Sequence, residues 1–128
     1  MSKEYNNDII TTRDIKNQGN KYKFYDDFYV VSDEGDIYFR TNNQKGDEEY
    51  VKKAVKEGRY YTVTIHQKRK YVHRIVAELF CSGQDTVENE QLKNTVDHKD
   101  GCRYNNKSEN LEWVSQGENN KRYEEKAG

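Results

Sequence analysis

The chain has 128 residues and a mass of 15.3 kDa, which corresponds to one domain or two very small ones and excludes a large multidomain enzyme. Hydrophobic residues make up only 32%, but 16 aromatic residues (11 Tyr, 4 Phe and 1 Trp) supply buried area that disordered chains lack, so we expect a folded protein with a small core. The net charge is −1, no apolar stretch approaches the roughly 20 residues that cross a bilayer, and no signal-peptide core follows Met1. We therefore expect a soluble, cytoplasmic protein without membrane contact.

The first part of the chain predicts one β-hairpin after a polar start. Residues 1–21 are polar, and we expect no ordered core element there apart from a short stretch near Ile9-Ile10. Residues 28–39 contain two runs of β-branched and aromatic residues around a Gly-containing turn, which is typical of a hairpin. A hydrophilic connector occupies residues 41–49, and residues 51–56 predict a short helical turn or the margin of a strand.

The middle of the chain predicts a second hairpin that leads into a helix. Residues 60–65 are typical of a strand, the basic stretch 67–70 predicts a turn, and residues 71–73 predict the returning strand. Apolar residues then recur at helical spacing over residues 73–81, which favours an amphipathic helix. A polar link over residues 84–94 follows.

The last part of the chain predicts the order strand, loop, strand, helix. These elements are expected over residues 95–98, 99–109, 111–114 and 115–125. The whole pattern predicts an α+β fold in which small antiparallel hairpins precede a ββα unit. We expect a polar, flexible N-terminus over residues 1–21, a β-hairpin module over 22–57 and a second domain over 58–128, packed together as one small unit.

Asp97 and His98 end the first of these two strands, just before a Lys-Asp-Gly turn. A neutral imidazole, with a reference pKa of about 6.5, can accept the proton of a water molecule near neutral pH, as phosphodiester hydrolysis requires. Asp97 supplies a hard oxygen ligand of the kind that Mg²⁺ prefers. Taken alone, the pair is also typical of a turn with a solvated histidine.

Three motifs surround this pair: VHRIVAELF over residues 72–80, VDHKDG over 96–101, and NLEWVS over 110–115 followed by Glu118-Asn119. Together they resemble the HNH nuclease family, in particular its small phage and homing-type enzymes with a ββα-metal active site. The match covers about residues 58–123. Residues 29–37 resemble the small module that often precedes this nuclease domain, although the tryptophan common near its start is missing.

The resemblance implies a metal-dependent endonuclease that acts on DNA, with no small-molecule cofactor beyond the metal. It implies that His98 is the general base, that Asn110 orients the imidazole, and that Asp97 and Asn119 bind one Mg²⁺ or Mn²⁺. Asn119 stands where the family name has histidine, a variation familiar in the homing-type branch. Its neutral carboxamide predicts weaker metal binding than two anionic ligands would give.

The charge is unevenly distributed along the chain. Residues 51–84 carry 8 basic and 2 acidic side chains, whereas residues 1–50 carry 7 and 11 and residues 85–128 carry 7 and 10. Cations among aromatic rings suit a phosphate backbone and its bases, and a solvated charged face is the alternative interpretation. The predicted nucleic-acid-binding residues are Arg59, Lys68, Arg69, Lys70, Arg74 and Arg103.

We predict that the enzyme nicks DNA, because one active site cuts one strand, and that double-strand cleavage would need a homodimer or a second encounter with the DNA. Only nine residues follow Asn119, so we expect little room for a C-terminal DNA-binding module and poor specificity for a long site unless the N-terminal hairpin supplies it. The net charge of −1 and the acidic flanks support an alternative, an inactive or weakly active HNH-fold module that binds or inhibits a nucleic acid or a protein. Two positions remain open for His73, beside the metal site or packed under the helix.

Overall fold

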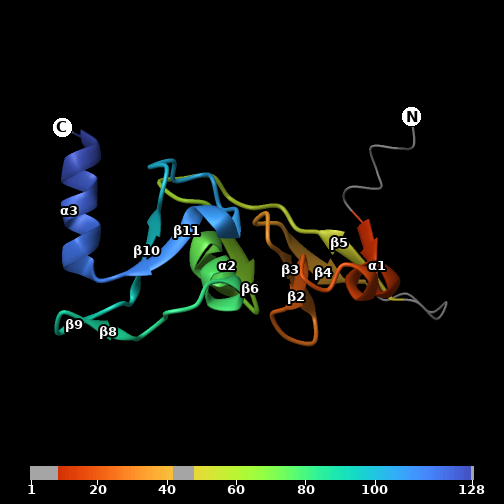
Figure 1. Ribbon diagram of the computed structural model, residues 1–128. Helices are drawn as coiled ribbons and strands as arrows, with labels where there is room; N and C mark the ends of the chain where they lie inside the picture. Colours follow the sequence, from red (N-terminus) through yellow and green to blue (C-terminus); the bar gives the residue numbers. More distant parts are fainter. Residues whose placement is uncertain (1–8, 42–47, 128) are drawn as a thin grey trace.

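The computed structural model describes residues 9–41 and 48–127 and has the expected α+β fold with antiparallel sheets. Figure 1 shows an N-terminal half, red to yellow, beside a C-terminal half, green to blue. The strands and helices are β1 (Ile9–Thr11), α1 (Thr12–Asn17), β2 (Tyr22–Phe24), β3 (Tyr29–Ser32), β4 (Ile37–Arg40), β5 (Glu49–Lys52), β6 (Thr62–Ile65), β7 (Lys68–Tyr71), α2 (Val72–Phe80), β8 (Val87–Glu88), β9 (Gln91–Leu92), β10 (Thr95–His98), β11 (Leu111–Val114) and α3 (Gln116–Ala127).

The N-terminal half is a five-stranded sheet in the order β1-β5-β4-β3-β2. Strands β3 and β4 form the predicted hairpin, with Val31 opposite Ile37. Helix α1 covers one face through Ile15, which packs in a buried cluster with Ile10, Tyr22, Val30, Tyr38 and Tyr50. The alternation of strand side chains explains why Val30 joins this cluster while Val31 points to the other face.

The start of the chain differs from the sequence prediction. Beyond Ile9-Ile10 we expected no ordered element before residue 22, but residues 12–17 form α1 and β1 is an edge strand of the sheet. Thr11 and Asp14 form a reciprocal capping box: the Thr11 hydroxyl accepts from the Asp14 N–H, and the Asp14 carboxylate accepts from the Thr11 N–H. Apolar periodicity failed here because a six-residue helix is stabilised by its cap and one buried isoleucine.

The structure decides one open alternative and corrects one turn. Of the two possibilities for residues 51–56, a helical turn or the margin of a strand, it has the strand: residues 49–52 form β5, which pairs with both β1 and β4. The turn of the second hairpin is His66-Gln67, with positive φ at both residues, so the basic residues 68–70 lie on the strand β7 itself. Most of the predicted connector, residues 42–47, lies outside the described residues.

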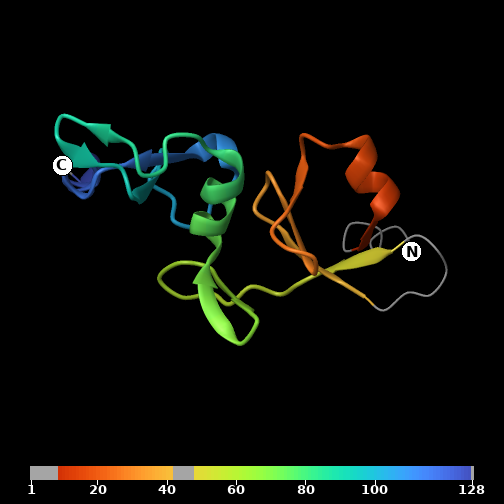
Figure 2. The ribbon, with the colours of Figure 1, turned by 90° about the horizontal axis from the view of Figure 1, so that it is seen from below.

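The C-terminal half contains the β6–β7 hairpin, helix α2, the β10–β11 pair and helix α3, all close to their predicted positions. Inside the predicted polar link, β8 and β9 form a small additional hairpin. The indole Nε1 of Trp113 on β11 donates to the main-chain oxygen of Ala77 on α2, at 3.2 Å. This bond and the apolar face of α2 fix the helix against the β10–β11 pair. In Figure 2 the β6–β7 hairpin, in light green, projects away from the rest of the molecule.

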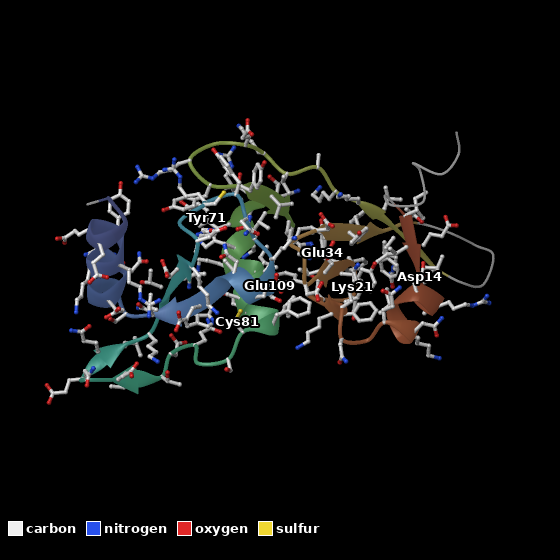
Figure 3. All side chains as sticks on the ribbon, turned by 45° about the horizontal axis from the view of Figure 1, so that its top comes forward. Asp14, Lys21, Glu34, Tyr71, Cys81 and Glu109 are labelled. Atoms are coloured by element: carbon white, nitrogen blue, oxygen red, sulfur yellow. The ribbon has the colours of Figure 1, made fainter. Side chains whose placement is uncertain are left out.

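The two halves share one apolar core. Tyr29, Val31 and Ile37 of the N-terminal sheet pack in the same buried cluster as the apolar side of α2 and Trp113. At the junction, the main-chain oxygen of Asp33 accepts from the Ser108 N–H at 2.7 Å. Figure 3 labels Glu34 and Glu109 on the two sides of this contact, and Tyr71 and Cys81 at the two ends of α2. Over the described residues, none of the helices is long and apolar enough to cross a membrane.

Candidate active site

Asp97 and His98 lie at the end of β10, and each is 6% exposed. Antiparallel pairing with β11 places Asp97 opposite Glu112 and His98 opposite Leu111. Helix α3 starts after Ser115, whose hydroxyl accepts from the Glu118 N–H at 3.0 Å and so caps the first turn. This cap sets the start of the helix that carries Asn119.

An open pocket of about 630 Å³ brings together His98, the predicted general base, and both predicted metal-binding residues. Asp97, His98 and Asn119 all line it, and so do Arg59, Arg74 and Arg103. The helix contributes its residues at helical spacing: Gln116, Asn119 and Tyr123. The lining of this pocket does not include Asn110, Lys68, Arg69 or Lys70.

His98 is held by an asparagine that the sequence prediction did not choose. Its Nε2 lies 2.9 Å from Oδ1 of Asn106, and this contact is buried. A carboxamide oxygen accepts, so the contact matches a His98 imidazole that carries its proton on Nε2. Asn106 therefore favours the tautomer in which Nδ1 is the unprotonated nitrogen.

Asn110, which we expected to orient His98, contacts the loop instead. Its Oδ1 accepts from the Asp100 N–H at 3.1 Å, and its Nδ2 donates to Asp100 Oδ1 and to the main-chain oxygen of Asn105. Its own main-chain oxygen accepts from the Lys99 N–H at 2.8 Å. Asn110 thus stabilises the loop that carries Asn106, and through these bonds it affects the His98 imidazole only indirectly. Residues 105 and 106 are both asparagines in one loop, and the sequence gave no reason to choose either of them as the partner of His98.

Asp97 is paired with an arginine that sequence reasoning missed. Arg122 Nη1 lies 3.1 Å from Asp97 Oδ2 and 2.8 Å from Glu112 Oε1, and its Nε lies 2.9 Å from Glu118 Oε2. The hydrogen bonds that Arg122 donates to Glu112 and Glu118, and then to Asp97, raise the pKa of Arg122, so it stays charged. The i,i+4 spacing of Glu118 and Arg122 predicts their ion pair from the sequence. The contact of Arg122 with Asp97 on β10 depends on the tertiary structure.

The donors in this pocket fit a hard divalent cation. The described residues include no group of three or more His, Cys, Asp and Glu side chains that could hold a metal by themselves. Asp97 and the carboxamide of Asn119 line one pocket, and Mg²⁺ commonly takes one or two protein oxygens together with water and phosphate oxygens. This donor set suits Mg²⁺ or Mn²⁺ better than a softer metal.

Five of the six predicted nucleic-acid-binding residues line two adjoining pockets, and we call the six together the basic track. Arg69 and Lys70 of β7 line a second pocket of about 380 Å³, which shares Arg59, Tyr60 and Tyr71 with the site pocket. Lys68 lies at the exposed start of β7. The Arg74 guanidinium lies 5.2 Å from the centre of the Trp113 ring, and its Nη1 donates to the main-chain oxygen of Asn94. Arg74 is therefore fixed in place, whereas Arg103 is exposed.

His73, the second residue of α2, is buried among other rings of the site. Its ring centre lies 5.0 Å from that of Tyr60, 5.3 Å from Tyr71 and 5.1 Å from His98. Burial, together with the nearby His98 and Arg74, lowers the pKa of His73 from 6.5 to about 3. Both positions that the sequence left open therefore apply, since His73 is packed at the start of α2 and also borders the site.

This burial predicts a specific dependence of stability on pH. Above pH 6.5 His73 is neutral in both states, and between pH 6.5 and about 3 only the unfolded chain binds the proton. The free energy of unfolding should thus fall on acidification, by up to about 1.4 kcal/mol per pH unit from this group. Urea unfolding of the wild type and of His73→Phe at pH 7 and pH 5 checks this. Equal losses in both proteins would contradict it.

The turn between β3 and β4 lies close against Asn106, the residue that contacts His98. Gly35 has φ +92°, and a Cβ built there would lie 3.0 Å from both Cβ and the main-chain oxygen of Asn106. We expect Gly35→Ala to lower the free energy of unfolding by about 1–3 kcal/mol, because the alanine is strained at this φ and displaces Asn106. Gly19→Ala, where the nearest atom is 3.9 Å away, is the matched control for urea unfolding. A stability loss as small as that of the control would contradict the contact.

The order β10, loop, β11, α3, with Asp97-His98 at the end of the first strand and Asn119 on the helix, is the ββα arrangement of the HNH endonuclease fold. No family model matches the chain. Over 98 residues the chain is 35% identical to the DNA endonuclease I-HmuI of Bacillus phage SP01, covering 73% of this chain and 50% of that protein. A solved structure on DNA binding and cleavage by the HNH homing endonuclease I-HmuI matches with a TM-score of 0.58 and 30% identity, over 83% of this chain and 59% of that one.

A further relative is an uncharacterized HNH endonuclease of Acanthamoeba polyphaga mimivirus, 34% identical over 93 residues, which are 70% of this chain and 24% of that protein. The predicted resemblance is thus confirmed, and the chain is homologous to HNH endonucleases. The chain spans about half the length of I-HmuI and about a quarter of the mimivirus protein.

Proposed function

We propose that this protein is a divalent-metal-dependent DNA endonuclease that hydrolyses phosphodiester bonds. The observation that carries the proposal is the contact of His98 Nε2 with Asn106 Oδ1, made beside a pocket that Asp97, Asn119 and three arginines line. An imidazole held in this way, in one pocket with a carboxylate and a carboxamide, can act as a general base toward a water molecule. Homology to HNH endonucleases supports the same activity.

The residues divide the reaction between them. His98 takes the proton of the attacking water at Nδ1, while Asn106 holds Nε2–H and orients the ring. Asp97 and Asn119 would hold the cation, and Arg122 keeps Oδ2 of Asp97 in place. A bound Mg²⁺ or Mn²⁺ would offset the negative charge that builds on the phosphate and the leaving oxygen.

DNA would bind along the basic track. Arg59 and Arg103 can reach a phosphate at the site pocket, and Arg69 and Lys70 extend the positive surface along β7. Tyr60 and Tyr71, which line both pockets, offer rings to bases or sugars. Binding of this kind should weaken steeply with salt and depend little on sequence.

One site per chain supports nicking of a single strand, in the cytoplasm of the cell that makes the protein. The alternative, an inactive HNH-fold module that binds or inhibits a partner, rested on the net charge of −1 and on acidic flanks. The comparisons do not favour it, and the basic track offsets the acidic flanks close to the site.

Supercoiled plasmid provides the test. We expect conversion to open circle with Mg²⁺ or Mn²⁺ and none with EDTA, assayed by gel electrophoresis. His66→Ala is the matched control variant, since His66 is exposed and contacts Asp26 rather than the site, and it should cut like the wild type. Absence of conversion with either metal, or conversion that EDTA leaves unchanged, would reject a metal-dependent nuclease. Linear product at early times would reject nicking alone.

A further inference from the structure

His73 carries a polar atom that the fold leaves unused. The residue is 8% exposed, and its Nδ1 is buried without a hydrogen-bond partner among the described residues. An unpartnered buried nitrogen destabilises a fold, so such atoms are rare and call for an explanation. A phenylalanine ring could pack between Tyr60 and Tyr71 without this penalty. Packing alone therefore does not explain an imidazole at this position.

The position of the ring supplies the explanation. His73 lines the same pocket as Asp97, His98 and Asn119, and its ring centre is 5.1 Å from that of His98. Tyr60 and Tyr71 contact the ring and limit its rotation. Because Nδ1 is buried, the edge that reaches the pocket is the one that carries Nε2.

The protonation of the ring follows from the same geometry. A neutral imidazole has one N–H, and on Nδ1 that donor would be buried without an acceptor, whereas on Nε2 it can reach a group in the pocket. No side chain caps α2 at Tyr71, so the positive end of the helix also lies beside the ring and opposes a second proton. Burial holds the pKa of His73 at about 3, consistent with a ring that is neutral over the working pH range.

We propose that His73 is a second catalytic histidine, which stays neutral and donates a hydrogen bond from Nε2–H to a non-bridging oxygen of the scissile phosphate. This role rests on the proposed endonuclease function. His98 removes the proton from water, and His73 moves no proton but stabilises charge on the phosphate oxygen. Two imidazoles with different environments would thus do different work in one pocket.

Variants at residue 73 separate hydrogen bonding from packing. His73→Phe keeps the ring but has no donor, and His73→Gln places an amide near the position of Nε2. We expect the single-turnover rate of nicking of supercoiled plasmid in Mg²⁺ to fall about 10–100-fold in His73→Phe and to be largely retained in His73→Gln. DNA affinity measured in EDTA should change little in either variant. If His73→Phe does not fold, His73→Asn, with its amide near Nδ1, replaces it as the inactive member of the pair.

Three outcomes are informative. Cleavage by His73→Phe at the wild-type rate would overturn the donor role while leaving the endonuclease intact. Equal losses in His73→Phe and His73→Gln would also overturn it. A wild type that never cuts would reject the endonuclease function and this role together.

Nitrogen NMR provides a readout that needs no metal and no turnover. The chain has only three histidines, so the signals of His73 can be assigned by comparison with His66→Ala and His98→Ala. With ¹⁵N-labelled histidine in EDTA, we expect the neutral Nε2–H form for His73 at pH 7 and a shift of its Nε2 signal on addition of a short DNA duplex. The Nδ1–H form, or a signal that DNA leaves unchanged, would overturn the proposal.

Discussion

Replacing His98 with alanine should lower the rate of plasmid nicking by about 10²–10⁴-fold, the usual range for loss of a general base. The structure places His98 in the site pocket with Nε2 against Asn106. Neither of the other two histidines is placed to act as the general base in its absence. His73, the nearest, is neutral and buried, and His66 lies on the β6–β7 turn beside Asp26. The measurement is single-turnover cleavage in Mg²⁺ between pH 6 and pH 9.

DNA binding provides the control for this variant. His98 is only 6% exposed, so His98→Ala should bind a DNA duplex in EDTA with nearly the affinity of the wild type. A variant that binds normally and does not cut assigns the loss to chemistry. Cleavage within a few-fold of the wild-type rate would exclude His98 as the base.

Replacing Asn106 with alanine should lower the cleavage rate by about 10–100-fold, because the imidazole loses the partner that sets its tautomer and orientation. Asn110→Ala is the informative comparison, since Asn110 makes three side-chain hydrogen bonds to the loop. We expect that variant to lose more stability, about 1–3 kcal/mol of unfolding free energy. Its activity loss should follow from a loosened loop.

Urea unfolding and single-turnover cleavage of the two variants decide between these roles. The expected pattern is a larger rate loss in Asn106→Ala and a larger stability loss in Asn110→Ala. The reverse pattern would return the orienting role to Asn110, as the family resemblance implied. Rates that scale only with stability in both variants would show that neither asparagine acts on His98 directly.

Local patterns predicted the second half of the chain well. The strand, loop, strand and helix that carry Asp97, His98 and Asn119 lie close to their predicted limits. The same patterns failed at residues 12–17, where a capping box and one buried isoleucine make a helix too short for periodicity. For residues 51–56 they left a helical turn and the margin of a strand open, because the strand form of β5 depends on pairing with two partners distant in sequence.

The sequence by itself determined the chemistry that this protein can carry: an imidazole, one carboxylate and one carboxamide at the spacing of two strands and a helix, with basic residues upstream. Only the tertiary structure decided how these groups are held. Asn106 rather than Asn110 contacts His98, Arg122 binds Asp97, and the turn at Gly35 lies close against Asn106. Each of these contacts joins different elements across the fold. Residue type and spacing report what a local segment can form, whereas such contacts depend on how separate segments pack against one another.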